Sequence, residues 1–591
     1  MSILHILQGK TIESLGELYN RPFTENDFQV NQTKPEFEGD YTVVLFSLVK
    51  SLKLSPDAIG NHLGEHLTKN NPKLFTGFNI IKGFLNLSVA NDYWLELLQK
   101  NYNHAAYGEQ APNGKKVMVE YSSPNTNKPL HLGHLRNNFL GWSVAEILKA
   151  NGYVVFKSCI VNDRGIHICK SMIAWQMFAN GATPQSTTTK GDHFVGEYYV
   201  KFNDEYKRQV KELVDKGISE ADAEKQAPIM LETQQMLLDW EAGKPDVMEL
   251  WKKMNGWVYE GFDVTYKNIG SDFDKTYYES NTYLLGKKTV EEGLAKGVFV
   301  KEADGSVWID LTNDGLDRKI VQRKDGTSVY ITQDIGLAQQ KYNEYKIDQS
   351  IYVIGDEQNY HMKVLKLIAE KLQLSNAENI YHLSYGMVEL PSGKMKSREG
   401  TVVDADDMVN EMISTAKRHT EELGKVKDFT TEELETLYRT IGMGAMKFYL
   451  LRVDPKKRMV FNPEESIDFH GFTGPFVQYT YARIKSILRK EQLQSAIPGD
   501  NGLLELEKKV LVALEQYPLI ILQAAKELNP SAIANYVFDV AKIFNSFYAE
   551  HSIANAETAT KKQLRLQMAI MTANVLKSGM HLLGAEVPER M

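Results

Sequence analysis

Hydrophobic positions along the chain follow two spacings, one typical of short buried strands and one typical of amphipathic helices. An apolar run over 117–121 predicts a strand. Apolar positions then recur at helical spacing over 133–150, the pair 151–152 favours the end of that helix, and a second apolar run covers 153–160. Strand, helix and strand in this order form a βαβ unit, which predicts a parallel sheet.

The same two patterns divide the rest of the chain. Residues 1–112 combine short helices and strands and are interpreted as a small α/β unit. Charged amphipathic helices over 190–262 interrupt the α/β alternation, which indicates an insertion. Strand patterns return at 306–310, 328–331 and 350–354, with helices after the last two. We interpret them as the second half of a doubly wound sheet.

Beyond residue 405 the pattern is helical to the end, which predicts an α-helical bundle. The predicted fold class is therefore α/β: a Rossmann-type doubly wound parallel sheet, with an N-terminal α/β domain and a C-terminal α-helical bundle. The predicted segments are 1–112 for the N-terminal domain, 113–189 and 266–404 for the halves of the Rossmann domain, 190–265 for the insertion, 405–465 for linking helices and 466–591 for the bundle.

Composition limits the possible classes of protein. The 591 residues are 43% hydrophobic and 24% charged, and no apolar run is long enough to predict a membrane span. The N-terminus lacks a signal-peptide pattern. The chain has two cysteines, too few for a disulfide framework or a cysteine-rich zinc cluster. A cytoplasmic location is therefore expected. The net charge is −8, but the segment 471–591 is slightly basic. A nucleic-acid-binding face therefore stays possible.

The tetrapeptide His131-Leu132-Gly133-His134 is the first pattern that points to chemistry. It stands between a predicted strand and a predicted helix, and a helix N-terminus attracts phosphate. Two imidazoles three residues apart lie on one face of the first turn and can donate to phosphate oxygens. Gly133 allows a base or ribose to approach the backbone. Such a tetrapeptide also arises by chance, and its βαβ setting is what favours function.

The octapeptide 393–400, Gly-Lys-Met-Lys-Ser-Arg-Glu-Gly, is the second such pattern. Lysines on a glycine-bounded loop suit stabilisation of a pyrophosphate, although a solvated basic turn has the same composition. Together the two patterns resemble the signatures of class I aminoacyl-tRNA synthetases. Within that class, the chain resembles arginyl-tRNA synthetases. The resemblance rests on four further segments: the extended first signature at 120–136, Tyr-x-Thr-x-Asp-Ile within 329–335, Gln-Tyr-Thr-Tyr-Ala-Arg at 478–483 and the C-terminal Pro-Glu-Arg-Met.

Binding of arginine agrees with the residue types. A guanidinium is planar and permanently charged, so a closed pocket for it needs carboxylates. Glu120 and Asp334 stand at carboxyl ends of predicted parallel strands, where open α/β sheets bind ligands, although Asp334 can also be read as a plain helix cap. The resemblance assigns the guanidinium to Glu120, Tyr330 and Asp334, and the backbone end of arginine to Ser123, Asn125 and Gln358.

The resemblance also assigns the ATP-binding residues, which are Lys128, His131, Gly133, His134, Met387, Lys394, Met395 and Ser397. The second signature departs from the family pattern Lys-Met-Ser-Lys-Ser, because Lys396 replaces a serine and Ser397 a lysine. Lys128 precedes His131 by three residues, so we hypothesise that Lys128 and Lys394 share the contacts to phosphate. The predicted catalytic residues are thus His131, His134, Lys394 and Lys128.

The implied reaction has two steps. Arginine attacks the α-phosphorus of ATP, which is bound with Mg²⁺, and a hydroxyl of the terminal adenosine of tRNA(Arg) then takes the arginyl group. The resemblance further implies that activation needs bound tRNA, that the N-terminal domain contacts the tRNA elbow, and that the protein is a monomer without a tightly bound cofactor or zinc. Predicted tRNA-binding residues are Tyr479, Tyr481, Arg483 and Met591, although the aromatic residues are equally typical of a helical core.

Other interpretations stay open at this point. A small-molecule nucleotidylyltransferase also uses the first signature, and a non-catalytic tRNA-binding scaffold would retain the bundle. The pentapeptide 62–66, His-Leu-Gly-Glu-His, matches a zinc-peptidase pattern, but its helical apolar spacing favours packing. Cys159 and Cys169 are read as buried core thiols.

Overall fold

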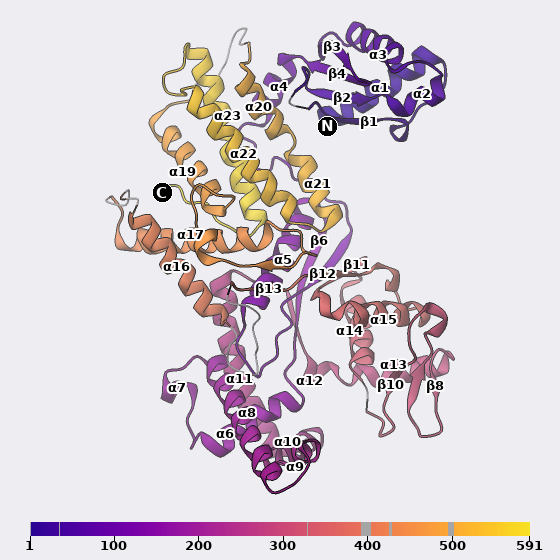
Figure 1. Cartoon of the computed structure of the whole chain (residues 1–591), viewed down its shortest axis with the longest axis vertical. Coiled ribbons are helices and arrows are strands. Elements are labelled where there is room, and N and C mark those ends of the chain that lie inside the picture. The colour runs from indigo at the N-terminus through magenta and orange to yellow at the C-terminus, as the bar shows by residue number, and fades with distance from the viewer. Residues whose placement is uncertain are drawn as a thin grey trace.

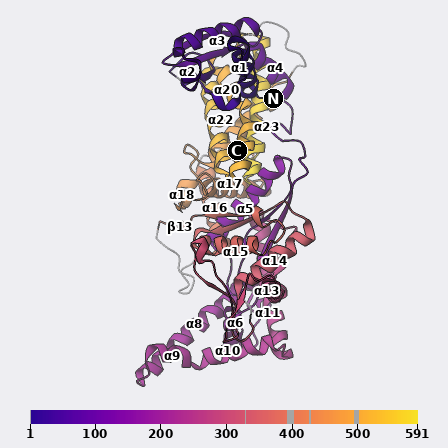
Figure 2. The same ribbon diagram turned by 90° about the vertical axis from the view of Figure 1, so that its right-hand side faces the viewer.

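The computed structural model describes residues 2–34, 36–327, 329–391, 403–422, 424, 428–493 and 502–591. The molecule is elongated (Figure 1). The N-terminal α/β domain and the C-terminal helices lie at one end, the parallel sheet lies in the middle, and a helical projection forms the other end. The same three levels follow one another along the long axis after a quarter turn (Figure 2).

A five-stranded parallel sheet lies in the middle, in the order β12-β11-β5-β6-β7. Its strands are β5 (Lys116–Glu120), β6 (Val154–Val161), β7 (Lys275–Tyr278), β11 (Gln349–Gly355) and β12 (Ile380–Tyr385). The chain first adds strands on one side of β5 and later returns to add strands on the other side. The topological switch point therefore lies between β5 and β11, and ligands of open α/β sheets bind outside the carboxyl ends of strands at such a point.

Helices cover both faces of this sheet. Successive side chains of a strand point to opposite faces of a sheet. In β5, three successive residues are at most 1% exposed, namely Val117, Met118 and Val119, so both faces are covered. The helices between and after the strands are α5 (Leu132–Ala150), α6 (Ile166–Phe178), α14 (Tyr330–Tyr345) and α15 (Asn359–Lys371). The predicted βαβ unit is confirmed, because β5, α5 and β6 match the predicted ranges to within two residues.

Two predictions for the second half need correction: the strand predicted at 306–310 is present but does not join the parallel sheet, and residues 329–331 of the strand predicted at 328–331 lead into a helix instead. Residues 306–310 contribute to a separate antiparallel sheet of β8 (Val300–Lys301), β9 (Val307–Ile309) and β10 (Lys319–Gln322). In the segment 328–331, α14 begins at Tyr330, where helix packing overrides a β-branched composition. The sequence pattern also missed β7, because this four-residue edge strand has a single neighbour and only one buried residue, Tyr277.

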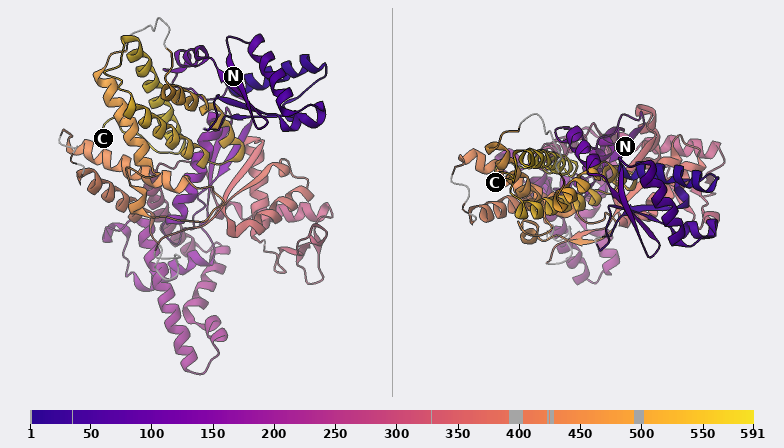
Figure 3. Two further views of the ribbon diagram at one scale, coloured as in Figure 1. Left: turned by 45° about the horizontal axis from the view of Figure 1, so that its top comes forward. Right: turned by 90° about the horizontal axis from the view of Figure 1, so that it is seen from above.

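The N-terminal domain contains an antiparallel sheet in the order β1-β2-β4-β3. Its elements are α1 (Ile3–Tyr19), β1 (Gln29–Gln32), β2 (Tyr41–Val44), α2 (Phe46–Leu52), α3 (Pro56–Asn70), β3 (Phe75–Ile81) and β4 (Phe84–Val89), and α4 (Asn91–Asn101) follows. The domain lies beside the C-terminal bundle (Figure 3). The N–H of Ile3, at the start of α1, donates to Glu515 Oε1 of the bundle (2.7 Å), and Lys508 pairs with Asp40 (2.7 Å).

The helical insertion forms the projection at the far end from the bundle (Figure 1). Its helices are α7 (Pro184–Thr187), α8 (Gly191–Asp215), α9 (Glu220–Gln226), α10 (Pro228–Glu241) and α11 (Pro245–Ile269), which confirms the helical prediction there. Its core includes an edge-to-face pair between Phe194 of α8 and Trp257 of α11, with ring centroids 5.5 Å apart. This pair helps to fix α8 on α11.

The described part of the chain beyond residue 405 consists of helices and their connections, as predicted, apart from β14 (Met459–Val460), which pairs with β13 (Val388–Glu389). Its helices are α16 (Ala405–Glu422), α17 (Thr431–Leu451), α18 (Pro463–Ser466), α19 (Gly474–Lys490), α20 (Glu505–Glu515), α21 (Tyr517–Glu527), α22 (Ser531–Glu550) and α23 (Ala559–Leu582). Within the described ranges, none of the helices combines the length and the apolar character that crossing a bilayer requires.

Candidate active site

The chain turns sharply directly after β5. Ser122 and Ser123 have positive φ angles of 76° and 46°, and residues other than glycine adopt this conformation at a cost of about 1–3 kcal/mol each. Buried hydrogen bonds hold the turn: the N–H of Ser122 donates to Asn137 Oδ1 (2.5 Å), and Ser122 Oγ lies 2.7 Å from the Tyr266 hydroxyl oxygen. The turn directs the next residues across the carboxyl end of the sheet, toward His131.

His131 and His134 cap the N-terminus of α5. His131 Nδ1 accepts a hydrogen bond from the N–H of Gly133 (3.1 Å), and His134 Nδ1 accepts one from the N–H of His131 (3.1 Å). A ring nitrogen that accepts carries no proton, so both neutral rings carry it on Nε2. Burial, assisted by the charge of Lys128, lowers the pKa of His131 to about 3 and that of His134 well below its ordinary value. Both imidazoles are therefore neutral donors at pH 7.

The cap packs tightly on Gly133, because a Cβ at its position would lie 3.0 Å from Cε1 of His131 and would press the ring aside. Contact with the His131 ring is thus a second reason for glycine at position 133, besides the approach of a nucleotide. Lys128 and His131 line a cavity of about 270 Å³, together with His193 and Asp404. The cavity brings a cationic side chain to the helix N-terminus, which is the environment that phosphate prefers.

The described residues leave out three of those that the resemblance assigns to ATP, namely Lys394, Met395 and Ser397. The hypothesis that Lys128 and Lys394 share the phosphate contacts thus stays a prediction. Met387 is described and follows β12; its carbonyl oxygen accepts a hydrogen bond from Arg136 (3.4 Å). Its sulfur lies close to Gly355, the last residue of β11, so Met387 is at the carboxyl edge of the sheet.

Glu120, the last residue of β5, is paired with a lysine that the sequence patterns did not single out. Lys341 of α14 donates to Glu120 Oε2, and both side chains are buried, with 1% and 7% exposed. Nζ of Lys341 also lies 4.7 Å from the ring centroid of Tyr352. Burial alone would lower the pKa of Lys341, but the Glu120 carboxylate outweighs it and the pKa is raised. One oxygen of Glu120 is thus committed to an internal cation.

Asp334 and Tyr330 project from the first turns of α14, and both are accessible. Asp334 Oδ2 lies 2.7 Å from Nε2 of His361, at the start of α15, and the Asp334 side chain is 38% exposed. Tyr330 is 67% exposed. The residue at the cap of α14 is Val329, so Asp334 is not a helix cap. Its carboxylate is instead directed to a neighbouring element, in reach of a ligand.

Glu279 is a further carboxylate at this end of the sheet. It is the first residue of α12 (Glu279–Thr282), directly after β7, and it is 8% exposed. Burial raises its pKa to about 7; Arg164 opposes this, and Asp163 and Asp334 add to it. Sequence reasoning missed Glu279 because β7 was missed. Its position one residue after a parallel strand is the signal that could have identified it.

The residues assigned to the backbone end of arginine follow two neighbouring strands. Ser123 and Asn125 follow β5: the carbonyl oxygen of Ser123 accepts from Asn162 Nδ2 (3.4 Å), and Asn125 pairs with Asn162 in a parallel bridge. Gln358 follows β11 and directly precedes α15. All three thus lie at the carboxyl edge of the sheet, on the two sides of the switch point.

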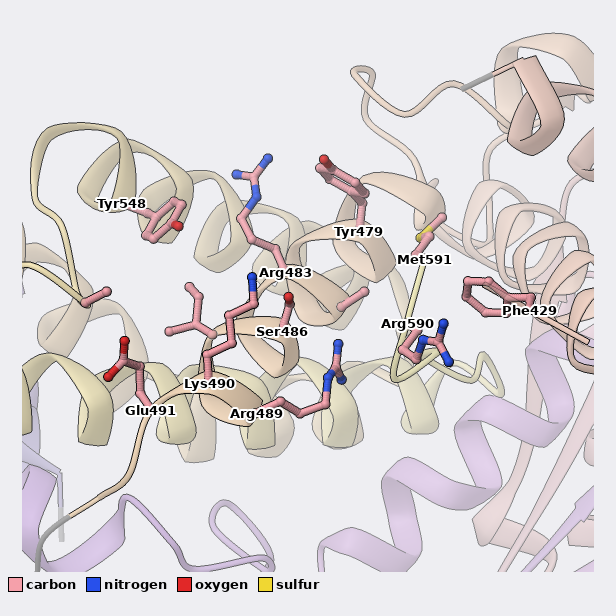
Figure 4. Close-up of a pocket in the computed structure, with 13 residues that line it drawn as sticks. Phe429, Tyr479, Arg483, Ser486, Arg489, Lys490, Glu491, Tyr548, Arg590 and Met591 are labelled. Atoms are coloured by element: carbon pink, nitrogen blue, oxygen red, sulfur yellow. The ribbon is translucent and has the colours of Figure 1, made fainter. Parts of the chain in front are cut away.

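A second cavity, of about 460 Å³, lies on the C-terminal bundle (Figure 4). Three of the predicted tRNA-binding residues line it, namely Tyr479, Arg483 and Met591. The guanidinium carbon of Arg483 lies 4.9 Å from the ring centroid of Tyr479 and 5.8 Å from that of Tyr548. Arg489, Lys490 and Arg590 add positive charge to the wall. Aromatic faces beside guanidinium groups suit an unstacked base with its phosphate.

Tyr481 does not belong to this cavity. It is 2% exposed, and its hydroxyl donates to Glu589 Oε1 (2.9 Å). The burial of Tyr481 in the helix core therefore argues against the prediction that this residue contacts tRNA directly. Of the three aromatic and basic side chains proposed from α19, two face the cavity and this one helps to hold the C-terminal segment.

The other patterns have structural partners. His66 Nε2 pairs with Glu17 (3.1 Å) and His62 Nδ1 lies 3.4 Å from the Tyr19 hydroxyl oxygen, so each histidine of the 62–66 pentapeptide contacts a residue of α1. Cys159 and Cys169 are buried free thiols, as expected, and burial raises the pKa of each to about 12.

Family models match three parts of the chain. The model of the class I (R) tRNA synthetase catalytic domain matches residues 96–462, which is more than half of the chain. A model of the DALR anticodon binding domain matches 477–591, and a model of the arginyl-tRNA synthetase N-terminal domain matches 5–89.

Relatives match over the full length. An arginine–tRNA ligase of Flavobacterium psychrophilum is 53% identical, and one of Bacteroides fragilis is 51% identical; each alignment covers 100% of both chains. Among solved structures, the Thermus thermophilus arginyl-tRNA synthetase superposes with a TM-score of 0.78 at 24% identity and covers 100% of both chains. A Plasmodium falciparum arginyl-tRNA synthetase gives 0.76 at 17% identity, covering 100% of this chain and 99% of that one.

These matches agree with the geometry of the site, in which paired imidazoles cap a helix at the switch point of a parallel sheet and carboxylates gather beside them. The chain therefore belongs to the arginine–tRNA ligase family of the class I aminoacyl-tRNA synthetases.

Proposed function

We propose that this chain activates L-arginine with ATP and transfers the arginyl group to the 3′-terminal adenosine of tRNA(Arg). The single observation that carries this proposal is the N-terminus of α5. There His131 and His134 present two neutral imidazoles, each with its proton on Nε2, at the switch point of the sheet. Carboxylates suited to a guanidinium lie at the same edge.

In the first step, the arginine carboxylate attacks the α-phosphorus of ATP in line and pyrophosphate leaves. The Nε2–H groups of His131 and His134 donate to phosphate oxygens as negative charge develops, and the N-terminus of α5 adds its positive end. Lys128 neutralises charge beside them, and Lys394 is proposed as the second lysine that contacts the phosphates. Mg²⁺ enters as part of the ATP substrate, bound mainly through phosphate and water.

The guanidinium of arginine is proposed to contact Asp334 and Tyr330, with the buried Glu279 as a third group. Glu120 contributes one carboxylate oxygen, because its other oxygen is held by Lys341. Lysine and citrulline satisfy such a site poorly: each leaves buried carboxylate oxygens without donors, which discriminates strongly. Ser123, Asn125 and Gln358 are proposed to bind the α-amino and carboxylate end.

In the second step, the 2′-hydroxyl of the terminal adenosine attacks the acyl carbon and AMP leaves. Positioning and charge stabilisation account for this chemistry, so no general base is assigned. The anticodon is proposed to occupy the cavity of Tyr479, Arg483 and Met591, and the N-terminal domain is proposed to contact the tRNA elbow.

We also propose a monomer in the cytoplasm, with the division into six segments predicted from the sequence. The matched ranges 5–89, 96–462 and 477–591 support three parts in this order, with the boundary between the second and third near residue 465. A dependence of arginine activation on bound tRNA belongs to the same proposal.

Charging of total tRNA with labelled arginine, ATP and Mg²⁺ tests this function, with lysine in parallel. Arginine-dependent pyrophosphate exchange is measured with and without tRNA. We expect charging with arginine alone and exchange only in the presence of tRNA. Binding of tRNA without charging would instead indicate the scaffold, and pyrophosphate exchange that needs neither amino acid nor tRNA would indicate the nucleotidylyltransferase.

A further inference from the structure

The residues that enter α16 pair with the His131 segment through their backbone. The N–H of Leu132 donates to the carbonyl oxygen of Val403 (3.2 Å), and the N–H of Ala405 donates to that of Leu130 (2.9 Å). Together these two bonds form an antiparallel bridge between His131 and Asp404. The position of the first catalytic histidine is thus coupled to a segment about 270 residues later in the chain.

Asp404 and Asp406 carry the side chains that fix this entering segment. Asp404 Oδ1 accepts from the N–H groups of Asp406 (2.8 Å) and Asp407 (3.2 Å), so Asp404 is the N-terminal cap of α16. The second oxygen, Oδ2, lies 3.1 Å from His193 Nε2, and Asp406 Oδ2 lies 3.4 Å from the same atom. Both carboxylates therefore bind one imidazole from the helical insertion.

Lys190 completes the cluster from the start of α8. Its Nζ lies 2.6 Å from Asp406 Oδ2 and 3.0 Å from Asp192 Oδ2. Asp192 is fully buried under α11, and a Cβ at Gly261 would lie 2.3 Å from its Oδ1, so glycine is needed there. Two cations and three carboxylates thus join the insertion to α16, all partly or fully buried, where removal of one partner costs more than at an exposed surface.

His193 is held as a cation by this arrangement. The neighbouring carboxylates of Asp404 and Asp406 raise its pKa to about 10, against the opposing effect of burial. The ring also lines the 270 Å³ cavity that contains Lys128 and His131. His193 is therefore on the insertion, but it faces the phosphate end of the site.

We propose that His193 is a positioning residue for the ATP-binding half of the active site. Through Asp404 and Asp406 it holds the segment 403–407 in the backbone pairing that fixes His131. The inference deepens the proposed function, because it rests on the use of ATP at His131, and it gives the helical insertion a task in nucleotide binding.

The test is ATP binding to the full-length protein, measured by titration calorimetry with Mg²⁺ and without arginine or tRNA. Asp404→Asn is the first variant, because asparagine is also a good helix cap and only the charge is lost. His193→Ala removes both ion pairs, and His193→Lys restores a cation. His66→Ala is the matched control, since His66 Nε2 also lies 3.1 Å from a carboxylate, that of Glu17, in the distant N-terminal domain.

We expect Asp404→Asn and His193→Ala to weaken ATP binding about tenfold, and His193→Lys to recover most of the loss. His66→Ala should bind ATP as the unmodified protein does. In the charging assay the KM for arginine should stay within about twofold of its original value, a split that general misfolding would not produce.

ATP binding within about twofold of the unmodified protein in both Asp404→Asn and His193→Ala would overturn the proposal. An equal rise of the KM values for ATP and arginine would overturn it as well. If His193→Ala unfolds at the assay temperature, Asp404→Asn decides alone. Unmodified protein that binds ATP but does not charge tRNA with arginine would refute the proposed function and leave this test intact.

Discussion

The ATP end and the arginine end of the active site are built in different ways. At the ATP end, His131, Gly133 and His134 bond to one another within four residues. At the arginine end, Glu120 is paired with Lys341, 221 residues later, and Asp334 with His361, 27 residues later. The cap at the ATP end forms within one turn of helix and is then held by the segment 403–407, whereas the pairs at the arginine end form only through the fold of the whole sheet.

The largest expected effect concerns the arginine end. Lys341→Met leaves Glu120 buried without its cation, and breaking a buried ion pair in this way costs about 3–5 kcal/mol of folding free energy. We expect a large drop in the urea midpoint of the unfolding transition that includes the parallel sheet. The double variant Lys341→Met/Glu120→Gln should recover part of that drop. Equal midpoints for the single variant and the unmodified protein would show that the pair is not essential to the sheet.

The next effect concerns the ATP end. His131→Asn keeps a helix-capping side chain but removes the imidazole Nε2–H, so folding should be unchanged. Loss of one donor to a developing charge costs about 10²- to 10³-fold in kcat, and we expect a loss of this size in arginine charging. The thermal unfolding midpoint is the control. A loss below threefold would mean that His131 serves only as a cap.

Asp334→Asn should separate the two ends kinetically. The amide retains the shape of the side chain but loses its charge-assisted bond to a guanidinium, so the KM for arginine should rise about 10- to 100-fold. The KM for ATP, measured in the same preparations, should stay near its original value. A parallel rise in both constants would contradict the division of the site into two ends.

The smallest effect is a pH dependence confined to the arginine end. The folded-state pKa of Glu279 is raised from 4.5 to about 7, so this group favours folding below pH 4.5 and loses that contribution as the pH rises to 7. A bound guanidinium favours the ionised form, so the KM for arginine should fall as the pH rises from 6 to 8. Glu279→Gln should flatten this profile, while the profile of the KM for ATP stays the same in both proteins. An unchanged slope in Glu279→Gln would remove Glu279 from the site.

The sequence could predict the elements and side-chain contacts that depend on short-range, periodic spacing. The first βαβ unit, the capping histidines and the helical C-terminal part follow from short-range spacing, and the structure confirms the elements. Lys341 and Glu279 could not be found in this way, because their roles come from strand order and from pairing across the sheet. Tyr481 shows the same limit on a helix: its spacing from Tyr479 is known from the sequence, but which of the two faces the core depends on the neighbouring helices.

The contact between Ile3 and Glu515 has a consequence for biosynthesis. The carboxylate that satisfies the first turn of α1 lies 512 residues later in the chain. At translation rates of about 5–20 residues per second, it is made about 25–100 s after α1. During that interval the N-terminal domain has emerged from the ribosome without the residue that fixes its orientation. Docking of the domain through this contact therefore follows the synthesis of α20, when most of the chain has already been made.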